Sequence, residues 1–384
     1  MIVQIININS KNVFELYNKK YNIFKNLRER GYFGLEIRDI SEDIAAELHK
    51  YFLKNEIFSY IKKKQSISIF ILGTFEQIIE VSNGIKSNIG ENVGHKITSV
   101  INNYLNYSSN KIPFVGSPNL LVQVMGILNV TPDSFSDGGL YFTKEKALEH
   151  INLMVDNGVD MIDIGGESSR PGAKNISVDE EIKRVIPVIE SAKKVPIPIS
   201  IDTTKSEVAE EALKNGVKII NDISGLTFDD KMMDVILKHN AGCVIMHMKG
   251  KPDNMQDNPE YEDVITEVYD FLYKQSEVAS KRGIKNIIID PGIGFGKSVR
   301  DNFNLINRLD EFKGLGYPIL IGVSRKSLIG KSLQLNINER EIPTVILETL
   351  AINKGAKIIR THNVQNAVHA RKLFSFVEMP DSVI

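Results

Sequence analysis

The amino-acid sequence predicts an α/β protein: a (β/α)8 barrel of the TIM-barrel class over residues 116–384, with a small N-terminal α/β appendage over residues 1–115. Two observations predict the barrel. From about residue 120, short apolar runs alternate with helical segments eight times within about 265 residues, which is the usual size of such a domain. Nearly every apolar run also stops in a polar segment, where barrel enzymes place their chemistry.

The predicted strands are near-continuous apolar runs, as burial on both faces of a sheet requires. They cover residues 120–130, 161–165, 197–202, 218–223, 242–248, 286–292, 318–324 and 357–362. The helices are expected at 144–158, from 177 onwards, and at 206–215, 229–239, 262–282, 301–312, 343–354 and 365–374, with a loop around 327–341. An open, doubly wound sheet is the alternative, but it normally has fewer strands and one phosphate-binding turn.

The first 115 residues read as a separate unit. A strand is expected at 3–7, a helix near 13–29 and a second strand at 66–72. Two further helices should begin after Ser41 and after Thr74, because both are good N-cap residues. Residues 106–118 read as a linker. This appendage shows no catalytic constellation, and its role stays open.

Composition excludes several classes of function. The formal net charge of −1 gives no field that would hold nucleic acid, and 42% hydrophobic residues are ordinary for a soluble protein. No run approaches the roughly 18–20 apolar residues of a membrane span. The first residues lack the basic segment and cleavage site of a signal peptide. A lone cysteine, Cys243, fits a reducing compartment. We therefore expect a cytoplasmic protein.

Polar side chains follow the predicted strands at the point where each strand ends. Because these ends meet at one mouth of a barrel, the side chains should converge. A carboxylate at such depth is costly unless it is paired or meets the donors of a ligand, so several acids together indicate a binding site. The residues are Asn129, Asp133, Asp137, Ser169, Arg170, Asp202, Asn221, Asp222, His247, Asp290, Lys326, Arg360 and His362.

Several common catalytic motifs are missing from the sequence. There is no H-E-x-x-H or cysteine cluster for zinc, and no G-x-S-x-G elbow. GIGFGKS, at 292–298, is one residue short of an ATP-binding phosphate loop, so its glycines are expected to allow close backbone approach to a flat ligand or to neighbouring strands. Asn and Asp would suit the amide-like edge of a heterocycle, whereas Arg and Lys favour phosphate. The residues therefore indicate a flat ring that carries a phosphorylated leaving group.

A series of ordered motifs between residues 120 and 376 resembles that of the dihydropteroate synthase family. The motifs are GILNVTPDSFSDGG, GGESSRPGA, IDT, IIND, MHM, DPGIGFGK, GVSRKSLIG and IIRTH. The resemblance implies a transferase of folate biosynthesis that condenses 6-hydroxymethyl-7,8-dihydropterin diphosphate with 4-aminobenzoate. The products would be 7,8-dihydropteroate and diphosphate, and the cofactor Mg²⁺. It also implies a cytoplasmic, typically homodimeric enzyme that sulfonamides inhibit, with no nucleic-acid or membrane partner.

The resemblance also implies roles for particular residues. The pterin would be bound by Asp202, Asn221, Met246, Asp290, Phe295, Gly322 and Lys326. The diphosphate would be bound by Asn129, Arg360 and His362, with Asn129 also near Mg²⁺. Loops carrying Asp133, Phe135, Asp137, Ser169 and Arg170 would close over the site. The aminobenzoate would be bound by Phe135, Ser169, Arg170 and Ser327. The catalytic residues would be Asp137, Asp202, Lys326 and Asn129.

Two positions depart from the family pattern. Ser169 replaces the usual Thr but keeps the hydroxyl. Asn363 stands where an acidic residue is common, and its presence could alter the affinity for diphosphate or Mg²⁺.

Two other functions remain as alternatives. A pterin-binding methyltransferase that uses methyltetrahydrofolate would not need Arg360, His362 or the S-R-K-S strand end. A non-catalytic pterin-binding protein should have a degraded Asn129 loop and no Lys326. The sequence contains all of these features.

Overall fold

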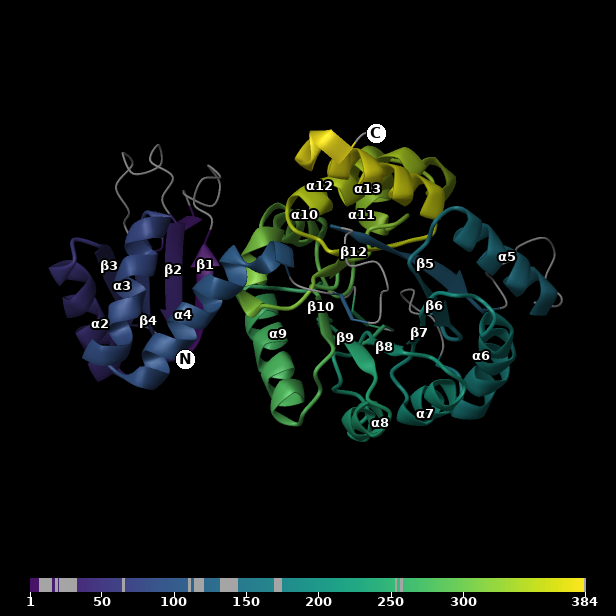
Figure 1. The fold of residues 1–384 in the computed structure, drawn as a ribbon, viewed down its shortest axis with the longest axis horizontal. Coiled ribbons are helices and arrows are strands. Elements are labelled where there is room, and N and C mark those ends of the chain that lie inside the picture. The colour runs from purple at the N-terminus through teal and green to yellow at the C-terminus, as the bar shows by residue number, and fades with distance from the viewer. Residues whose placement is uncertain are drawn as a thin grey trace. The chain divides into compact units, whose positions relative to one another are not determined.

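The computed structural model describes residues 1–6, 16–17, 20, 33–63, 66–109, 112–113, 121–131, 144–168, 175–252, 254–255 and 258–382. The chain divides into two compact units, labelled by element in Figure 1. The smaller unit comprises Met1–Asn110 and Asp310–Gly316, and the larger comprises Lys111–Leu309 and Tyr317–Ile384. The predicted boundary at 115/116 lies outside the described residues. The inclusion of Asp310–Gly316 in the N-terminal unit has no counterpart in the sequence-based prediction.

Eight parallel strands form the barrel of the larger unit, in the order β10-β9-β8-β7-β6-β5-β12-β11. A further parallel bridge between Ile289 and Ile319 joins the two ends of this order. The predicted (β/α)8 barrel is therefore confirmed, and the open sheet is excluded. The strands are β5 (Gln123–Asn129), β6 (Met161–Gly165), β7 (Ile199–Asp202), β8 (Ile219–Asp222), β9 (Gly242–Met246), β10 (Ile287–Asp290), β11 (Leu320–Ile321) and β12 (Ile358–Thr361).

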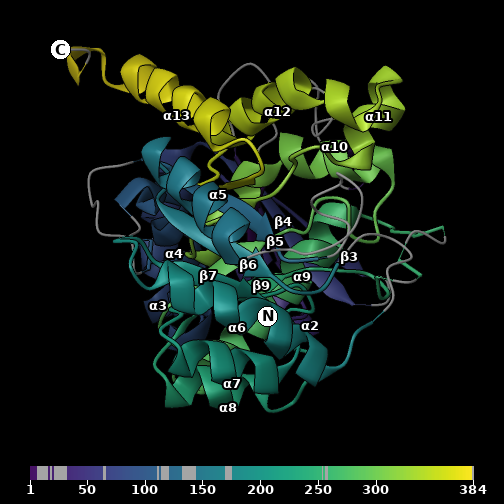
Figure 2. The same cartoon turned by 90° about the vertical axis from the view of Figure 1, so that its right-hand side faces the viewer.

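Helices surround the strands on the outside of the barrel (Figures 1 and 2). They are α5 (Lys144–Asp156), α6 (Val178–Ala192), α7 (Ser206–Lys214), α8 (Met232–Lys238), α9 (Val264–Lys281), α10 (Val299–Asn307), α11 (Ser327–Leu333), α12 (Glu341–Asn353) and α13 (Val364–Glu378). The loop predicted at 327–341 is wrong over its first half, where α11 forms because Leu328 and Ile329 supply a buried apolar side. Within the described part of the chain, no helix has the length and apolarity needed to cross a membrane.

The interior of the barrel is layered. An apolar cluster is formed by Met125, Met161, Ile219, Val244, Ile288, Leu320 and Ile358. Because side chains alternate along a strand, residues two positions further on point to the same interior. On most of the strands these positions hold polar or small residues, or the flexible Met246. They are Asp163, Asn221, Met246, Asp290, Gly322 and Arg360. The barrel thus places a polar layer directly above an apolar floor.

The N-terminal unit is an antiparallel sheet with helices, in the strand order β1-β2-β4-β3. Its elements are β1 (Ile2–Ile6), β2 (Phe33–Arg38), α2 (Glu42–Lys54), β3 (Phe58–Lys63), β4 (Ile67–Gly73), α3 (Phe75–Asn88) and α4 (Glu91–Leu105). Ser41 caps α2, and Thr74 with Gln77 forms a capping box on α3, as predicted. Strands β2 and β3 and helix α4 are additional. The helix predicted at 13–29 lies largely outside the described residues.

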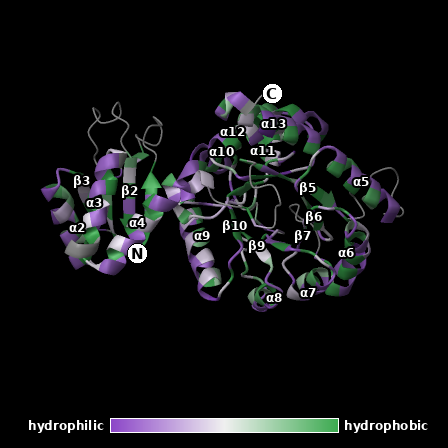
Figure 3. Ribbon diagram, in the orientation of Figure 1, coloured by the Kyte–Doolittle hydropathy of each residue, from purple (hydrophilic) through white to green (hydrophobic). Residues whose placement is uncertain are grey.

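The two faces of this sheet differ in chemistry. One face packs apolar side chains such as Leu35 against the helices, and Figure 3 shows hydrophobic, green stretches on strands of this sheet. The other face carries a buried polar network. Arg38 Nη1 donates to Gln4 Oε1 at 2.9 Å and to Glu36 Oε2 at 2.8 Å. Gln4 Nε2 in turn donates to Glu311 Oε2 at 3.0 Å, so the segment Asp310–Gly316 is bonded into the unit.

Replacing the fully buried Glu36 by Gln should lower the free energy of unfolding of this unit by about 3–5 kcal/mol, because Arg38 loses a charge partner inside the protein. Urea unfolding followed by circular dichroism measures the change. Glu42→Gln is the matched control, since the Glu42–Lys63 pair is more than half exposed and should contribute less than about 1 kcal/mol. Equal effects of the two variants would contradict a stabilising role for the buried network.

Candidate active site

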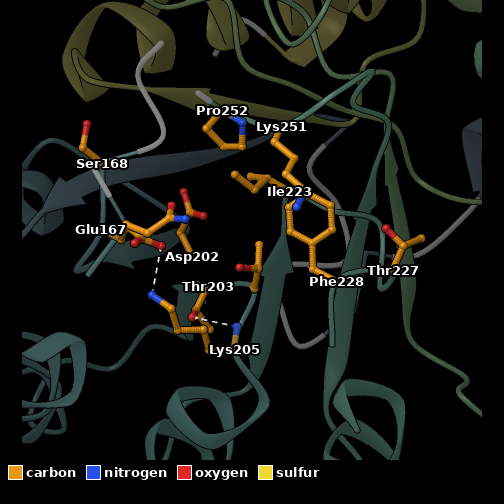
Figure 4. Close-up of a pocket in the computed structure, with 12 residues that line it drawn as sticks. Glu167, Ser168, Asp202, Thr203, Lys205, Ile223, Thr227, Phe228, Lys251 and Pro252 are labelled. Carbon is orange, nitrogen blue, oxygen red and sulfur yellow. Dashed lines mark hydrogen bonds and ion pairs between the residues drawn. The ribbon is translucent and has the colours of Figure 1, made fainter. Parts of the chain in front are cut away.

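A cavity of 460 Å³ opens beside Asp202 at the carboxyl ends of the strands. Residues from the loops that follow β6, β7, β8 and β9 line it. Figure 4 shows Asp202 and Glu167 on one side of this cavity, and Phe228 with Lys251 on the other. The volume falls within the usual range for a small-molecule site.

Charged side chains meet in the barrel interior next to this cavity. Arg360 donates from Nη2 to Asp202 Oδ2 at 2.8 Å and from Nε to Asp163 Oδ2 at 2.7 Å. Burial raises the pKa of Asp202 to about 7, although the guanidinium of Arg360 opposes the shift. One cation therefore compensates two inward-facing carboxylates. N–H donors from a ligand would complete the stabilisation of the acids.

The neighbouring strands add further acceptors to the same layer. Asn221 lies beside Asp202 in the strand register, and Asp290 lies beside Met246. Asn221 Nδ2 donates to Asp163 Oδ2 at 2.8 Å. Asp290 Oδ1 accepts from the backbone N–H of Gly292 at 2.7 Å. Burial raises the pKa of Asp290, with the Lys326 ammonium acting against this shift.

Lys326 and Phe295 form one wall of this polar layer. Lys326 Nζ lies 4.6 Å from the centre of the Phe295 ring and donates to the carbonyl of Ile293. Burial lowers the pKa of Lys326 to about 8, an effect that Asp290 opposes. Gly322 lies near both Lys326 and Arg360, and an added Cβ there would make only ordinary contacts, the nearest at 3.8 Å. Among the described residues nothing requires this glycine, which fits space reserved for a ligand.

The glycines of the segment 292–298 allow it to pack closely against the backbone of a neighbouring loop, and they do not form a phosphate loop. A Cβ on Gly292 would lie 1.9 Å from the carbonyl oxygen of His247, and one on Gly296 would lie 2.1 Å from that of Lys249. The expected close backbone approach is confirmed, toward the loop after β9. Lys297 is buried, and its Nζ donates to the carbonyls of His247 at 3.1 Å, Gly292 at 2.9 Å and Phe295 at 2.9 Å.

Two of the strand-end residues predicted for the site have structural roles. The His247 ring is buried with its Nδ1 2.9 Å from Lys297 Nζ, so it belongs to the same group of contacts around the Lys297 ammonium. Burial and the adjacent Lys297 lower the pKa of His247 to about 2. Asp222 Oδ1 accepts from the backbone N–H of Ser224 at 2.7 Å and supports the turn after β8.

The residues expected to hold an anion lie on β5 and at the end of β12, which are neighbouring strands of the barrel. Asn129 ends β5, and its Oδ1 lies with the Asp202 side chain around Gly165. The backbone N–H of His362 donates to Ser324 Oγ at 3.2 Å, and His362 Nδ1 lies 2.9 Å from the same oxygen. In the tautomer in which Nδ1 accepts from the Ser324 hydroxyl, the ring proton of His362 is on Nε2.

The structure supplies an acidic neighbour for Asn363. Asn363 Nδ2 donates to Glu341 Oε2 at 3.0 Å, and the same Glu341 forms an ion pair with Arg325. Asn363 Oδ1 accepts from the backbone N–H of Asn366 at 3.1 Å and caps α13. The carboxylate of Glu341, on α12, therefore lies beside position 363. In the family pattern, the residue at this position is itself acidic.

Several predicted residues are not placed in this geometry. Ser327 is exposed at the first position of α11, directly after Lys326. The remaining loop residues lie outside the described residues: Asp133, Phe135, Asp137, Ser169 and Arg170.

Asp163 is a residue of the polar layer that is absent from the predicted site. It lies in the middle of β6 between two isoleucines, whereas the predicted polar residues lie at strand ends. Its signal is its position two residues after Met161, the same offset that relates Asn221 to Ile219. This two-residue offset identifies an inward-facing residue only when the residues of the apolar layer are known.

Comparison with known proteins identifies the larger unit. Residues 125–362 match the family model described as pterin binding enzyme. The dihydropteroate synthase of Bacillus subtilis strain 168 is 48% identical over 253 residues, which cover 65% of this chain and 86% of that protein.

Solved structures agree with this match. The Yersinia pestis dihydropteroate synthase in a sulfonamide drug complex has a TM-score of 0.64 at 40% identity, covering 67% of this chain and 94% of that one. The Xanthomonas albilineans enzyme with 4-aminobenzoic acid has a TM-score of 0.63 at 41% identity, covering 67% and 93%. The family match spans the strands that carry the polar layer described above. This chain therefore belongs to the pterin-binding enzyme family, among its dihydropteroate synthases.

Proposed function

We propose that the larger unit condenses 6-hydroxymethyl-7,8-dihydropterin diphosphate with 4-aminobenzoate to give 7,8-dihydropteroate and diphosphate in folate biosynthesis. The observation that carries this proposal is the polar layer of the barrel, in which oxygen acceptors on β7, β8 and β10 face the ammonium of Lys326. Such a layer suits a flat ring with N–H donors on one edge and acceptors on another.

The pterin lies against this layer. Asp202, Asn221 and Asp290 accept hydrogen bonds from its amino and ring N–H groups. Lys326 donates to its oxygen or nitrogen edge. Met246 and Phe295 cover the two ring faces, and the missing side chain of Gly322 leaves room for the ring. The carboxylates are buried, so the ligand's donors contribute more than they would in water.

The reaction breaks the C–O bond to diphosphate and forms a C–N bond to the aromatic amine. Positive charge develops on the pterin as diphosphate leaves. The fixed carboxylates of Asp202 and Asp290 stabilise that charge without reorganising. The amine of aminobenzoate is already neutral, so its attack needs no strong general base, and the nitrogen releases its proton after the bond forms.

Arg360, His362 and Asn129 hold the leaving diphosphate, because a guanidinium and an imidazole N–H suit phosphate oxygens. No group of three or more His, Cys, Asp or Glu that could hold a metal occurs among the described residues. A Mg²⁺ ion fits here only with ligands mainly from diphosphate and water, plus the Asn129 amide oxygen, as is common for this ion. When bound, it would neutralise charge on the leaving group.

Other assignments follow from the motif series. Phe135, Ser169, Arg170 and Ser327 are assigned to aminobenzoate, and Asp137 is assigned a catalytic charge near the developing cation. We further propose a cytoplasmic location for the enzyme.

Protein given the pterin diphosphate, 4-aminobenzoate and Mg²⁺ should release diphosphate only when aminobenzoate is present. Lys326→Ala and Asp290→Asn should each lower kcat/KM by about 100-fold or more, because each removes a fixed group that acts on the charged transition state. A coupled assay for diphosphate measures the rates. Lys331→Ala, which changes an exposed lysine of α11, should behave as the parent protein. Near-normal rates for both site variants would show that the pocket has been misplaced.

The ammonium of Lys326 should lose its proton at a lower pH than an ordinary lysine. Burial lowers its pKa to about 8 from 10.5, so the charged form predominates below about 8 and disappears above it. Competitive acetylation across this pH range, read by mass spectrometry of the ligand-free protein, measures the midpoint. The exposed Lys331, in the helix that begins directly after Lys326, serves as the reference. A Lys326 midpoint near 10.5 would contradict the desolvated environment.

The surface of α12 suggests how the enzyme forms a homodimer, which we also propose. Ile342, Ile346 and Leu350 are 75%, 54% and 50% exposed and follow each other at four-residue intervals, so they share one face. Helix α13 lies beside α12 in both views and exposes Leu373 and Val377 (Figures 1 and 2). A continuous apolar surface of this kind marks an interaction site. We assign it to a second copy of the chain.

Changing Ile346 to Lys should convert a dimer into a monomer, since a charge at the centre of an apolar interface would be buried without a partner. Light scattering after size exclusion measures the mass. Leu153→Lys is the matched control, because Leu153 is a 57% exposed apolar residue on α5, outside the α12–α13 surface. A parent protein that is monomeric, or an Ile346→Lys variant that stays dimeric, would contradict this interface.

A further inference from the structure

Asp163 is a buried carboxylate that bonds two residues of the site and has no exposed surface of its own. Its Oδ2 accepts from Asn221 Nδ2 at 2.8 Å and from Arg360 Nε at 2.7 Å. Because Asp163 itself is covered, its contact with the site runs through these two neighbours.

The bond to Asn221 fixes which end of the amide meets a ligand. An asparagine amide has a donor end and an acceptor end of nearly equal shape, whereas an ionised carboxylate only accepts. With its NH₂ turned to Asp163, Asn221 has its Oδ1 left for the ligand. Asp202 and Asp290 also offer only oxygens when ionised. Asn221, Asp202 and Asp290 therefore all present hydrogen-bond acceptors to the ring.

The bond to Arg360 fixes the guanidinium in the same way. Its Nε is held by Asp163 and its Nη2 by Asp202, at 2.7 Å and 2.8 Å. Because the guanidinium is a rigid planar fork, two bonds determine its plane. The same carboxylate oxygen, Asp163 Oδ2, accepts from both Arg360 and Asn221, so the two orientations are held by one atom.

We propose that Asp163 is a positioning residue that sets the hydrogen-bond polarity of the pterin site, by making Asn221 an acceptor and by aligning Arg360. This inference rests on the proposed function and deepens it. The site selects a bicyclic ring whose buried edge carries an amino group, and it rejects the same ring with a carbonyl there, because two oxygens would face each other.

Two commercial pteridines test this selectivity without any turnover: pterin, which has the 2-amino group, and lumazine, which has a 2-carbonyl. The test variant is Asp163→Asn, which keeps the shape but removes the charge that orients Asn221. Ser200→Ala is the matched control. Ser200 is the register partner of Asp163 on β7, it is equally buried, and its hydroxyl has no bond to any described residue.

Calorimetry should show that the parent protein and Ser200→Ala bind pterin more tightly than lumazine. In Asp163→Asn this preference should fall about tenfold, the usual consequence of losing one well-placed hydrogen bond. The KM for pterin diphosphate should rise, while that for aminobenzoate stays within about twofold.

A purely structural role predicts a different result. It would lower the melting temperature of Asp163→Asn and leave the ratio of pterin to lumazine affinity unchanged, and that outcome overturns the proposal. If Asp163→Asn does not fold, Asn221→Ala decides, because removal of the acceptor amide should lower the same ratio about tenfold. An unchanged ratio in Asn221→Ala also overturns it. Absence of aminobenzoate-dependent diphosphate release would refute the proposed function, whereas the binding ratio tests Asp163 independently.

Discussion

The guanidinium of Arg360 holds two acids of the barrel interior in place. It reaches from β12 past the neighbouring β5 to Asp163 on β6 and Asp202 on β7, so it joins residues that are far apart in sequence. This contact depends on the pairing of β12, the last strand of the chain, with β5, the first strand of the barrel. Without the guanidinium, Asp163 and Asp202 would each lose the cation that they contact, and an uncompensated buried charge is strongly destabilising. Closure of the fold and chemistry of the site therefore depend on each other.

Much of the barrel and part of the site could be predicted from sequence. Asp202 and Asp290 were found because they end apolar runs, and Lys326 because it follows one. Asp163 was not found because it lies inside a run, and its inward direction depends on the register between strands, which no single segment reveals. Helix α11 has only 7 residues, about two turns, which is too short to show a clear periodicity. The predicted residues of the two long loops stay predictions.

A sequence motif in this chain can have a different structural role from the one that its residues indicate. Lys297 follows a glycine-rich stretch, as in a phosphate loop, yet its ammonium is bonded to three backbone carbonyls and stiffens the segment that carries Asp290 and Phe295. The reverse holds at Asn363. There the acidic residue of the family pattern is missing from the sequence position, but Glu341 brings a carboxylate to the same place from another helix. The contacts that a side chain makes in the folded protein, more than its identity at one sequence position, decide its chemical role.

The segment Asp310–Gly316 belongs to the N-terminal unit although about 200 residues of barrel precede it in the chain. On the ribosome, the first 110 residues therefore emerge without the piece that supplies Glu311 to Gln4. That unit reaches its full set of native contacts only after most of the barrel has been translated. Maturation of the two units is consequently linked by the order of synthesis.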